Sequence, residues 1–171
     1  MADSATPLNT MTSRIFKLTS IALATTALSI SLAFADPYAV GSKVEAFTAN
    51  DQHEKSFTLN PAATSYLLVS HDMETGKKAN AVLTDLGKDH LSSKKAVYVA
   101  NVHGMPGIGR MFAMPKMKKY AHTIILGDDA ALIAKFPEEK GKVTVLTLKS
   151  SKVTAVRYWS PETESLDDIL K

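Results

Sequence analysis

Two histidines stand where two apolar segments of the chain end. They are His71, which is followed by Asp72, and His103, with Met105 two residues further on. If the two segments are neighbouring parallel strands, these side chains share one edge of a sheet, where α/β proteins usually place their chemistry. Two imidazoles and a carboxylate can bind a divalent metal, and histidine with methionine suits copper. Alternatively, His71 forms a hydrogen bond with the free end of a helix or with loop backbone, and His103 is an ordinary loop residue.

Three methionines, Met111, Met114 and Met117, follow at intervals of three residues. On a helix this spacing aligns their thioethers along one face, and soft thioethers are suitable ligands for Cu(I). Pro115 interrupts the helix and weakens this interpretation. The same residues also suit core packing, a lid, or an adaptable apolar surface that contacts a partner protein or an anionic membrane. Because the segment 103–120 contains several glycines and prolines, we expect it to be a mobile lid over the sheet edge.

The chain contains no cysteine. This excludes thiol redox chemistry, thiolate metal sites and iron–sulfur clusters. A serine nucleophile is not predicted either: Ser70 and His71 are adjacent on a strand, so their side chains point to opposite faces, and the G-x-S-x-G pattern is absent. The glycine-rich stretch 104–109 lacks the Rossmann and P-loop patterns. The sequence therefore predicts no catalytic residue and no cofactor-binding residue.

A strand, a helix and a second strand must position these groups. The run Tyr66–Ser70 is apolar enough for a buried strand. Asp72 or Thr75 can cap the helix that follows, which we expect to reach about Leu91. A second buried strand is predicted at 96–102, and this order implies a right-handed parallel crossover.

The remaining segments are expected to surround this unit. Polar turns between apolar runs indicate one β-hairpin within 44–59 and another within 143–159. The segment 103–120 is expected to begin as a loop and to contain one or two short helical turns. The other expected elements are a strand at Thr123–Leu126, a short helix or edge strand at Ala130–Phe136, and a closing helix capped by Ser160 that runs to Leu170.

The first 35 residues differ from the rest of the chain. Arg14 and Lys17 precede an almost uncharged run that ends in Ala33-Phe34-Ala35, the pattern of a secretory signal peptide and its cleavage site. We expect the true start at Met11 and cleavage after Ala35. The mature domain, residues 36–171, would then be periplasmic or secreted. The alternative is a retained membrane anchor.

The order of these elements resembles the thioredoxin-like fold in its peroxiredoxin/TlpA-like branch. The segment 120–136 looks like the strand, aspartate turn and short helix of that branch, and 142–159 looks like its last hairpin. Through Asn80-Ala81-Val82-Leu83 and residues 106–112, the chain is also similar to the small periplasmic YtfJ-like group. The resemblance implies an α/β protein, a thioredoxin-like three-layer α/β/α sandwich with an N-terminal β-hairpin.

The catalytic groups that the resemblance implies are missing from this sequence. Oxidoreductases of the family place a cysteine at the start of the first helix and a cis-proline before the penultimate strand. This chain has Glu74-Thr75-Gly76-Lys77 and Gly141-Lys142-Val143 at those places. We therefore expect a non-catalytic binding or accessory module with a periplasmic protein as its partner.

The alternative function is copper binding or delivery, with His71, Asp72, His103, Met105, Met111, Met114 and Met117 as ligands. Nucleic acid is not an expected partner, because the net charge of +3 is spread along the chain and no reading element is recognisable. Membrane contact is expected only through the signal segment or the segment 103–120.

Overall fold

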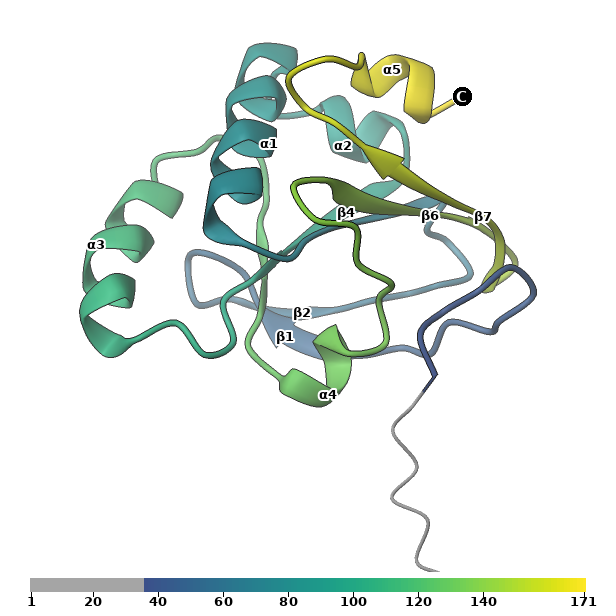
Figure 1. Ribbon diagram of the computed structural model, residues 1–171, viewed down its shortest axis with the longest axis horizontal. Coiled ribbons are helices and arrows are strands. Elements are labelled where there is room, and N and C mark those ends of the chain that lie inside the picture. Colours follow the sequence, from purple (N-terminus) through teal and green to yellow (C-terminus); the bar gives the residue numbers. More distant parts are fainter. Residues whose placement is uncertain (1–35) are drawn as a thin grey trace, which may run out of the picture. The chain divides into compact units, whose positions relative to one another are not determined.

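The computed structural model describes residues 36–171, which fold around a five-stranded sheet with the order β5-β4-β3-β6-β7 (Figure 1). The predicted signal segment, residues 1–35, lies outside the described residues. The strands of the sheet are Tyr66–Ser70 (β3), Ala96–Asn101 (β4), Ile125–Gly127 (β5), Val143–Lys149 (β6) and Lys152–Trp159 (β7).

The parallel arrangement predicted for the first two central strands is confirmed. β3 pairs in parallel with β4, with Ser70 opposite Ala100, and β4 pairs in parallel with β5. β6 lies on the other side of β3 and is antiparallel to it, and β7 completes the predicted final hairpin. The carboxyl ends of β3, β4 and β5 therefore meet at one edge of the sheet.

Helix α1 (Met73–Leu86) follows β3 directly and is capped by Asp72, one of the two predicted caps. Its residues Ala79 and Leu83, one turn apart, are buried in the core. The helix is shorter than predicted, because Gly87 adopts a φ of +90° and takes the backbone out of the helix. The segment expected to complete it forms a separate short helix, α2 (His90–Ser93).

Two apolar clusters cover the two faces of the sheet, which gives the predicted three layers (Figure 1). On one face, α1, α2 and the C-terminal helix α5 (Leu166–Ile169) pack over a core that includes Tyr98 and Trp159. On the other face lie the predicted hairpin, β1 (Thr48–Asn50) and β2 (Ser56–Thr58), and the short helix α4 (Ala130–Ile133). The third layer is thus mostly hairpin.

The segment 103–120 is more regular than predicted. It contains α3 (Gly107–Met117), a helix of 11 residues that continues through Pro115. The proline removes one backbone donor from the last turn. The backbone bond from Lys118 N–H to the carbonyl of Met114 at 3.0 Å nevertheless closes the last turn.

The third strand and the closing helix both begin later than predicted, because side chains form hydrogen bonds with backbone groups near their predicted starts. Gln52 bonds to the His122 carbonyl and to the Ile124 N–H, so the third strand begins at Ile125 instead of Thr123. The indole of Trp159 donates to the Glu164 carbonyl at 3.0 Å, and the residues expected to open the closing helix form turns. That helix is therefore restricted to α5. Within residues 36–171, no helix is both long enough and apolar enough to cross a membrane.

Candidate functional site

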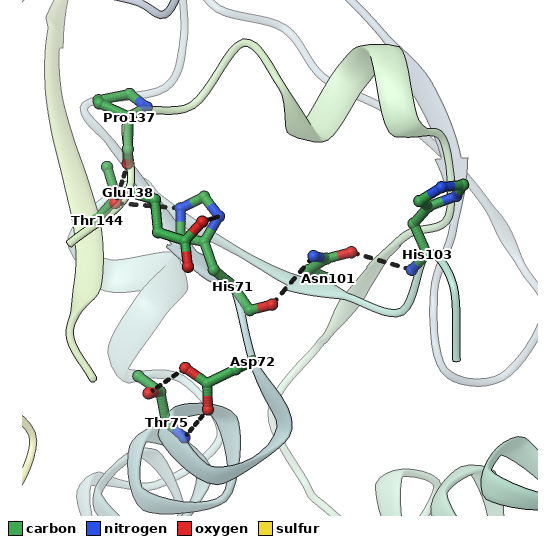
Figure 2. Close-up of polar contacts among 8 residues, drawn as sticks. All are labelled: His71, Asp72, Thr75, Asn101, His103, Pro137, Glu138 and Thr144. Atoms are coloured by element: carbon green, nitrogen blue, oxygen red, sulfur yellow. Dashed lines mark hydrogen bonds and ion pairs between the residues drawn. The ribbon is translucent and has the colours of Figure 1, made fainter. Parts of the chain in front are cut away.

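The corner between β3 and α1 is held by the carboxylate of Asp72. Its Oδ1 accepts a hydrogen bond from the backbone N–H of Thr75 at 2.8 Å, and its Oδ2 accepts one from the Thr75 hydroxyl at 2.6 Å (Figure 2). Burial alone would raise the pKa of Asp72, but the hydrogen bonds from Thr75 outweigh this effect and lower the pKa. Asp72 is therefore an ionised helix cap whose oxygen atoms are already engaged.

His71 turns its ring away from α1 and toward the start of β6 (Figure 2). Its Nε2 lies 3.2 Å from Thr144 Oγ1, and the Thr144 hydroxyl donates its proton to the carbonyl of Pro137. Thr144 must therefore accept the proton of His71 Nε2. Burial lowers the pKa of His71, and Glu138, 4.0 Å from Nδ1, opposes this effect only in part. His71 is thus a neutral group that ties the end of β3 to β6.

Asn101 links the carboxyl ends of the two parallel strands. Its Nδ2 donates to the His71 carbonyl at 3.0 Å, and its Oδ1 accepts the backbone N–H of His103 at 3.0 Å. The His103 side chain is exposed, and its Nδ1 lies 3.1 Å from the carbonyl of Asp128. Figure 2 shows the two imidazoles well apart from each other, on opposite sides of Asn101. The sequence pattern predicts both histidines at this edge, but no pattern in it points to Asn101.

The methionines of the predicted copper site also lie in different surroundings. Met117 is buried, Met105 and Met114 pack partly against the core, and Met111 is 64% exposed. Among residues 36–171, no three His, Cys, Asp or Glu side chains are grouped in a way that could hold a metal ion. Asp72, Met105 and Met117 do line one cavity, whereas Met111 is exposed to solvent. Copper binding by the predicted ligands stays a prediction.

Two buried hydroxyls lie under the first turn of α1. The hydroxyls of Ser70 and Tyr98 are 2.9 Å apart, and an added Cβ at Gly76 would lie 3.3 Å from Ser70 Oγ. Glycine therefore lets the helix approach the strand closely at this point. Burial raises the pKa of Tyr98, so its hydroxyl stays protonated. The pair packs the helix onto the sheet and supplies no ionised nucleophile.

A cavity of about 220 Å³ opens beside this turn. It lies between the first turns of α1, the ends of β3 and β4, and α3, and its walls are mostly apolar. Two lysines, Lys77 and Lys116, line it as well. The apolar side chains in its walls include Met73, Val102, Met105 and Phe112. The cavity thus occupies the sheet edge where the sequence analysis expected function, but most of its walls come from α1 and α3.

Helix α3 forms the outer wall of the cavity and is held largely by polar contacts. Arg110 is paired with Asp128, whose pKa is lowered by the hydrogen bond, and Lys118 lies 2.7 Å from Glu54. Met117 is the one buried residue of this helix. A second groove, of about 670 Å³, lies between α3 and β1. A helix with so little buried apolar surface is expected to open more easily than the sheet.

A buried polar pair that no sequence pattern predicted lies behind the cavity. The His122 side chain is 1% exposed, its Nε2 lies 2.9 Å from Asn80 Oδ1, and its ring stacks on Tyr120 at a centroid distance of 5.4 Å. Burial lowers the pKa of His122, so the neutral ring donates from Nε2. Its Nδ1 has no hydrogen-bond partner within residues 36–171. Asn80 and Tyr120 also line the cavity, which connects this pair to its inner wall.

Comparison with known proteins gave no matching family model and no matching curated protein. Solved structures do match. The thioredoxin domain of a thiol-disulfide oxidoreductase from Bacteroides vulgatus aligns at 17% identity with a TM-score of 0.52, over 78% of this chain and 99% of that one. The peroxidoxin BcpB from Mycobacterium tuberculosis aligns at 15% identity with a TM-score of 0.53, over 78% of this chain and 94% of that one.

A thiol:disulfide interchange protein from Bacteroides sp. aligns at 16% identity with a TM-score of 0.51, over 78% of this chain and 91% of that one. At these identities the likeness shows the fold alone. The chain therefore has the thioredoxin-like fold of thiol-disulfide oxidoreductases and peroxidoxins, but it contains no cysteine.

Proposed function

We propose that this chain is an exported, non-catalytic binding protein that uses the sheet edge between α1 and α3 to hold a protein partner. The observation that carries the proposal is an open, mostly apolar cavity at the start of α1 in a thioredoxin-like fold without cysteine. Protein interfaces are often centred on apolar pockets of this kind, which a large side chain of the partner fills. A fold by itself does not define an activity, so the site has to carry the argument.

The side chains at this edge support binding better than catalysis. The carboxylate of Asp72 and the hydroxyl of Thr75 are hydrogen-bonded to each other, and the His71 ring is hydrogen-bonded to the Thr144 hydroxyl. General acid–base or nucleophilic catalysis needs a group that is free to reach a substrate. The exposed His103 has no carboxylate or hydroxyl hydrogen-bonded to its ring within residues 36–171. The edge thus offers a shaped apolar surface and positive charge.

Export is the part of the proposal that rests on sequence. The basic residues, apolar run and Ala33-Phe34-Ala35 site at 1–35 support secretion to the periplasm or beyond. A cysteine-free domain needs no disulfide chemistry in that compartment. Mass spectrometry of the protein from its native cells tests this part, and the expected mass is that of a chain whose first residue is Asp36.

The test of the binding function compares capture of periplasmic proteins by the chain and by Ala113→Trp, which places a large ring in the cavity wall. Ala131→Trp, on the exposed side of α4, is the matched control. We expect the wild-type chain and the control to retain the same partner, and Ala113→Trp to lose it. The wild-type chain should not reduce insulin disulfides or consume peroxide. Either activity would refute the proposal, as would equal capture by all three proteins.

A further inference from the structure

Most of the exposed large apolar side chains of the domain lie on α3 and at the start of α1, the two helices that form walls of the cavity. Of the six large apolar residues that are exposed among residues 36–171, three lie on α3 and one at the start of α1. Phe112 lines the cavity, and Ile108 lies one turn before it on the same face of α3. The four residues and their exposed fractions are Met73 (49%), Ile108 (68%), Met111 (64%) and Phe112 (65%). Contiguous exposed apolar surface of this kind marks interaction sites.

The charge at the same place is positive and only partly compensated. The segment 103–120 contains no acidic residue. Arg110 and Lys118 are paired with acidic side chains of the domain, but Lys77 and Lys116, which line the cavity, form no ion pair within residues 36–171. The one carboxylate in the lining, Asp72, is engaged by Thr75. An occupant that brings carboxylates to the two lysines would therefore be favoured.

The size of the cavity suits an anchoring side chain. Its volume of about 220 Å³ is below the range of roughly 300–1,000 Å³ that is typical of sites for small organic ligands. Protein interfaces, in contrast, are centred on a few large side chains that fill pockets of the partner. Met73 and Met105 in the walls can adapt their shape, as methionines do on surfaces that bind peptides.

We propose that the cavity and the exposed face of α3 bind an acidic peptide segment of the partner protein, which inserts one large apolar side chain between α1 and α3. Its carboxylates pair with Lys77 and Lys116, and its further apolar residues lie on Ile108 and Met111. This inference rests on the proposed binding function and specifies its ligand. A membrane surface fits less well, because a flat bilayer can cover α3 but leaves the cavity between two helices unfilled.

The experiment selects peptides from a random phage-displayed library on the immobilised full chain and, in parallel, on Phe112→Ser. We expect the wild-type selection to enrich peptides that combine aspartate or glutamate with phenylalanine, leucine or methionine. A fluorescent copy of the most enriched peptide is then titrated by anisotropy. Phe112→Ser, and Lys77→Gln with Lys116→Gln, should each weaken binding by about tenfold or more. Added salt should weaken the wild-type complex and should affect the double lysine variant less.

Matched controls separate these effects from a general change of surface. Val40→Ser removes an apolar residue that is 67% exposed outside the site, and Lys149→Gln with Lys152→Gln removes two exposed charges on the last hairpin. Both should bind the peptide like the wild type. Because all substituted residues are exposed, each variant should keep its circular dichroism spectrum.

Three results would overturn the inference. The first is a selection that enriches no peptides combining acidic and apolar residues, and the second is equal affinity of Phe112→Ser and the wild type for the peptide. The third is that the chain binds phosphatidylglycerol vesicles but no peptide, and that the same substitutions abolish this vesicle binding. The last result would assign the face to an anionic membrane. None of the three decides the proposed function, which the capture experiment with Ala113→Trp and the insulin assay test separately.

Discussion

At the scale of single residues, the polar groups next to α1 serve the structure. Asp72 caps the helix, His71 joins β3 to β6, and Asn101 joins the ends of the two parallel strands. Each of these groups is already hydrogen-bonded to another part of the domain.

The first prediction concerns the helix cap. Asp72→Ala should lower the free energy of unfolding by about 1 kcal/mol, because the first turn of α1 loses the acceptor of its backbone N–H. Asp72→Asn should have a much smaller effect, since asparagine caps almost as well. Asp85→Ala, in the last turn of the same helix, is the control and should be neutral or slightly stabilising. Urea unfolding curves measure all three, and equal stability of Asp72→Ala and the wild type would contradict the assigned role.

The second prediction concerns acid. Burial lowers the pKa of His71 and of His122 from the ordinary value of 6.5. As the pH is lowered, these histidines therefore bind protons at a higher pH in the unfolded chain than in the folded one. The free energy of unfolding should fall as the pH drops below 6.5. The fall should level off below the lowered pKa values. Asp72, whose pKa is lowered from 3.8, should cause a further loss only at pH values below that.

Urea unfolding between about pH 7.5 and about pH 5 measures this dependence. His122→Gln, which keeps a donor for Asn80, should show a shallower pH dependence than the wild type. The control His53→Gln replaces an exposed histidine on the N-terminal hairpin turn and should keep the wild-type slope. A slope unaffected by His122→Gln would show that His122 does not contribute.

At the scale of elements, α3 is the least firmly packed helix beside the cavity. Its polar contacts to Asp128 and Glu54 fix its position, while Met117 alone is buried. The part of the predicted lid that lies at the sheet edge is thus one helix, α3, which forms a wall of the cavity. Its opening would change the size of the proposed binding site.

The third prediction is that amide hydrogen exchange in α3 is faster than in β3 and β4, whose residues are mostly buried. Asp128→Ala should accelerate exchange in α3 further, because Arg110 loses its carboxylate partner. Asp85→Ala should leave α3 unchanged. Mass spectrometry of exchanged peptides gives the rates. Protection of α3 equal to that of the two strands would show that the helix belongs to the core.

At the scale of the whole molecule, two apolar clusters on opposite faces of one sheet account for the stability of the domain. Both are formed by residues between Tyr38 and Leu170. They include large, fully buried side chains such as Leu68, Trp159 and Leu146. A domain of this size can bury enough apolar surface to fold without disulfides.

The fourth prediction follows from the position of these clusters. A chain that begins at Asp36 should fold by itself, with cooperative urea unfolding and the α/β circular dichroism spectrum of the full chain. Trp159→Ala in this shorter chain should cost about 3–5 kcal/mol, because the buried indole leaves a cavity. Tyr158→Ala, a half-buried neighbour on the same strand, should cost much less. Failure of the shorter chain to unfold cooperatively would contradict the domain boundary.

The sequence alone determined the features that depend on local patterns. Apolar runs located β3, β4 and the last hairpin, and the polar residues beyond β3 predicted two possible caps of α1, Asp72 and Thr75, of which Asp72 is the cap. The absence of cysteine is by itself enough to exclude thiol chemistry. These features are local because strand alternation, caps and turns are set by residues close together in the chain.

The tertiary structure decided where the side chains point and what they contact. His71 is turned by Thr144, which lies 73 residues away, and His122 is buried beside Asn80, 42 residues earlier. Gln52 set the start of β5, and contacts from Glu54 and Asp128 placed α3 over the cavity. A strand pattern assigns a residue to an edge of the sheet, but its rotamer depends on neighbours that only folding brings together. For that reason the sequence placed the two histidines at one edge, and only the folded chain shows that their rings lie apart on either side of Asn101 and that an apolar cavity opens between α1 and α3.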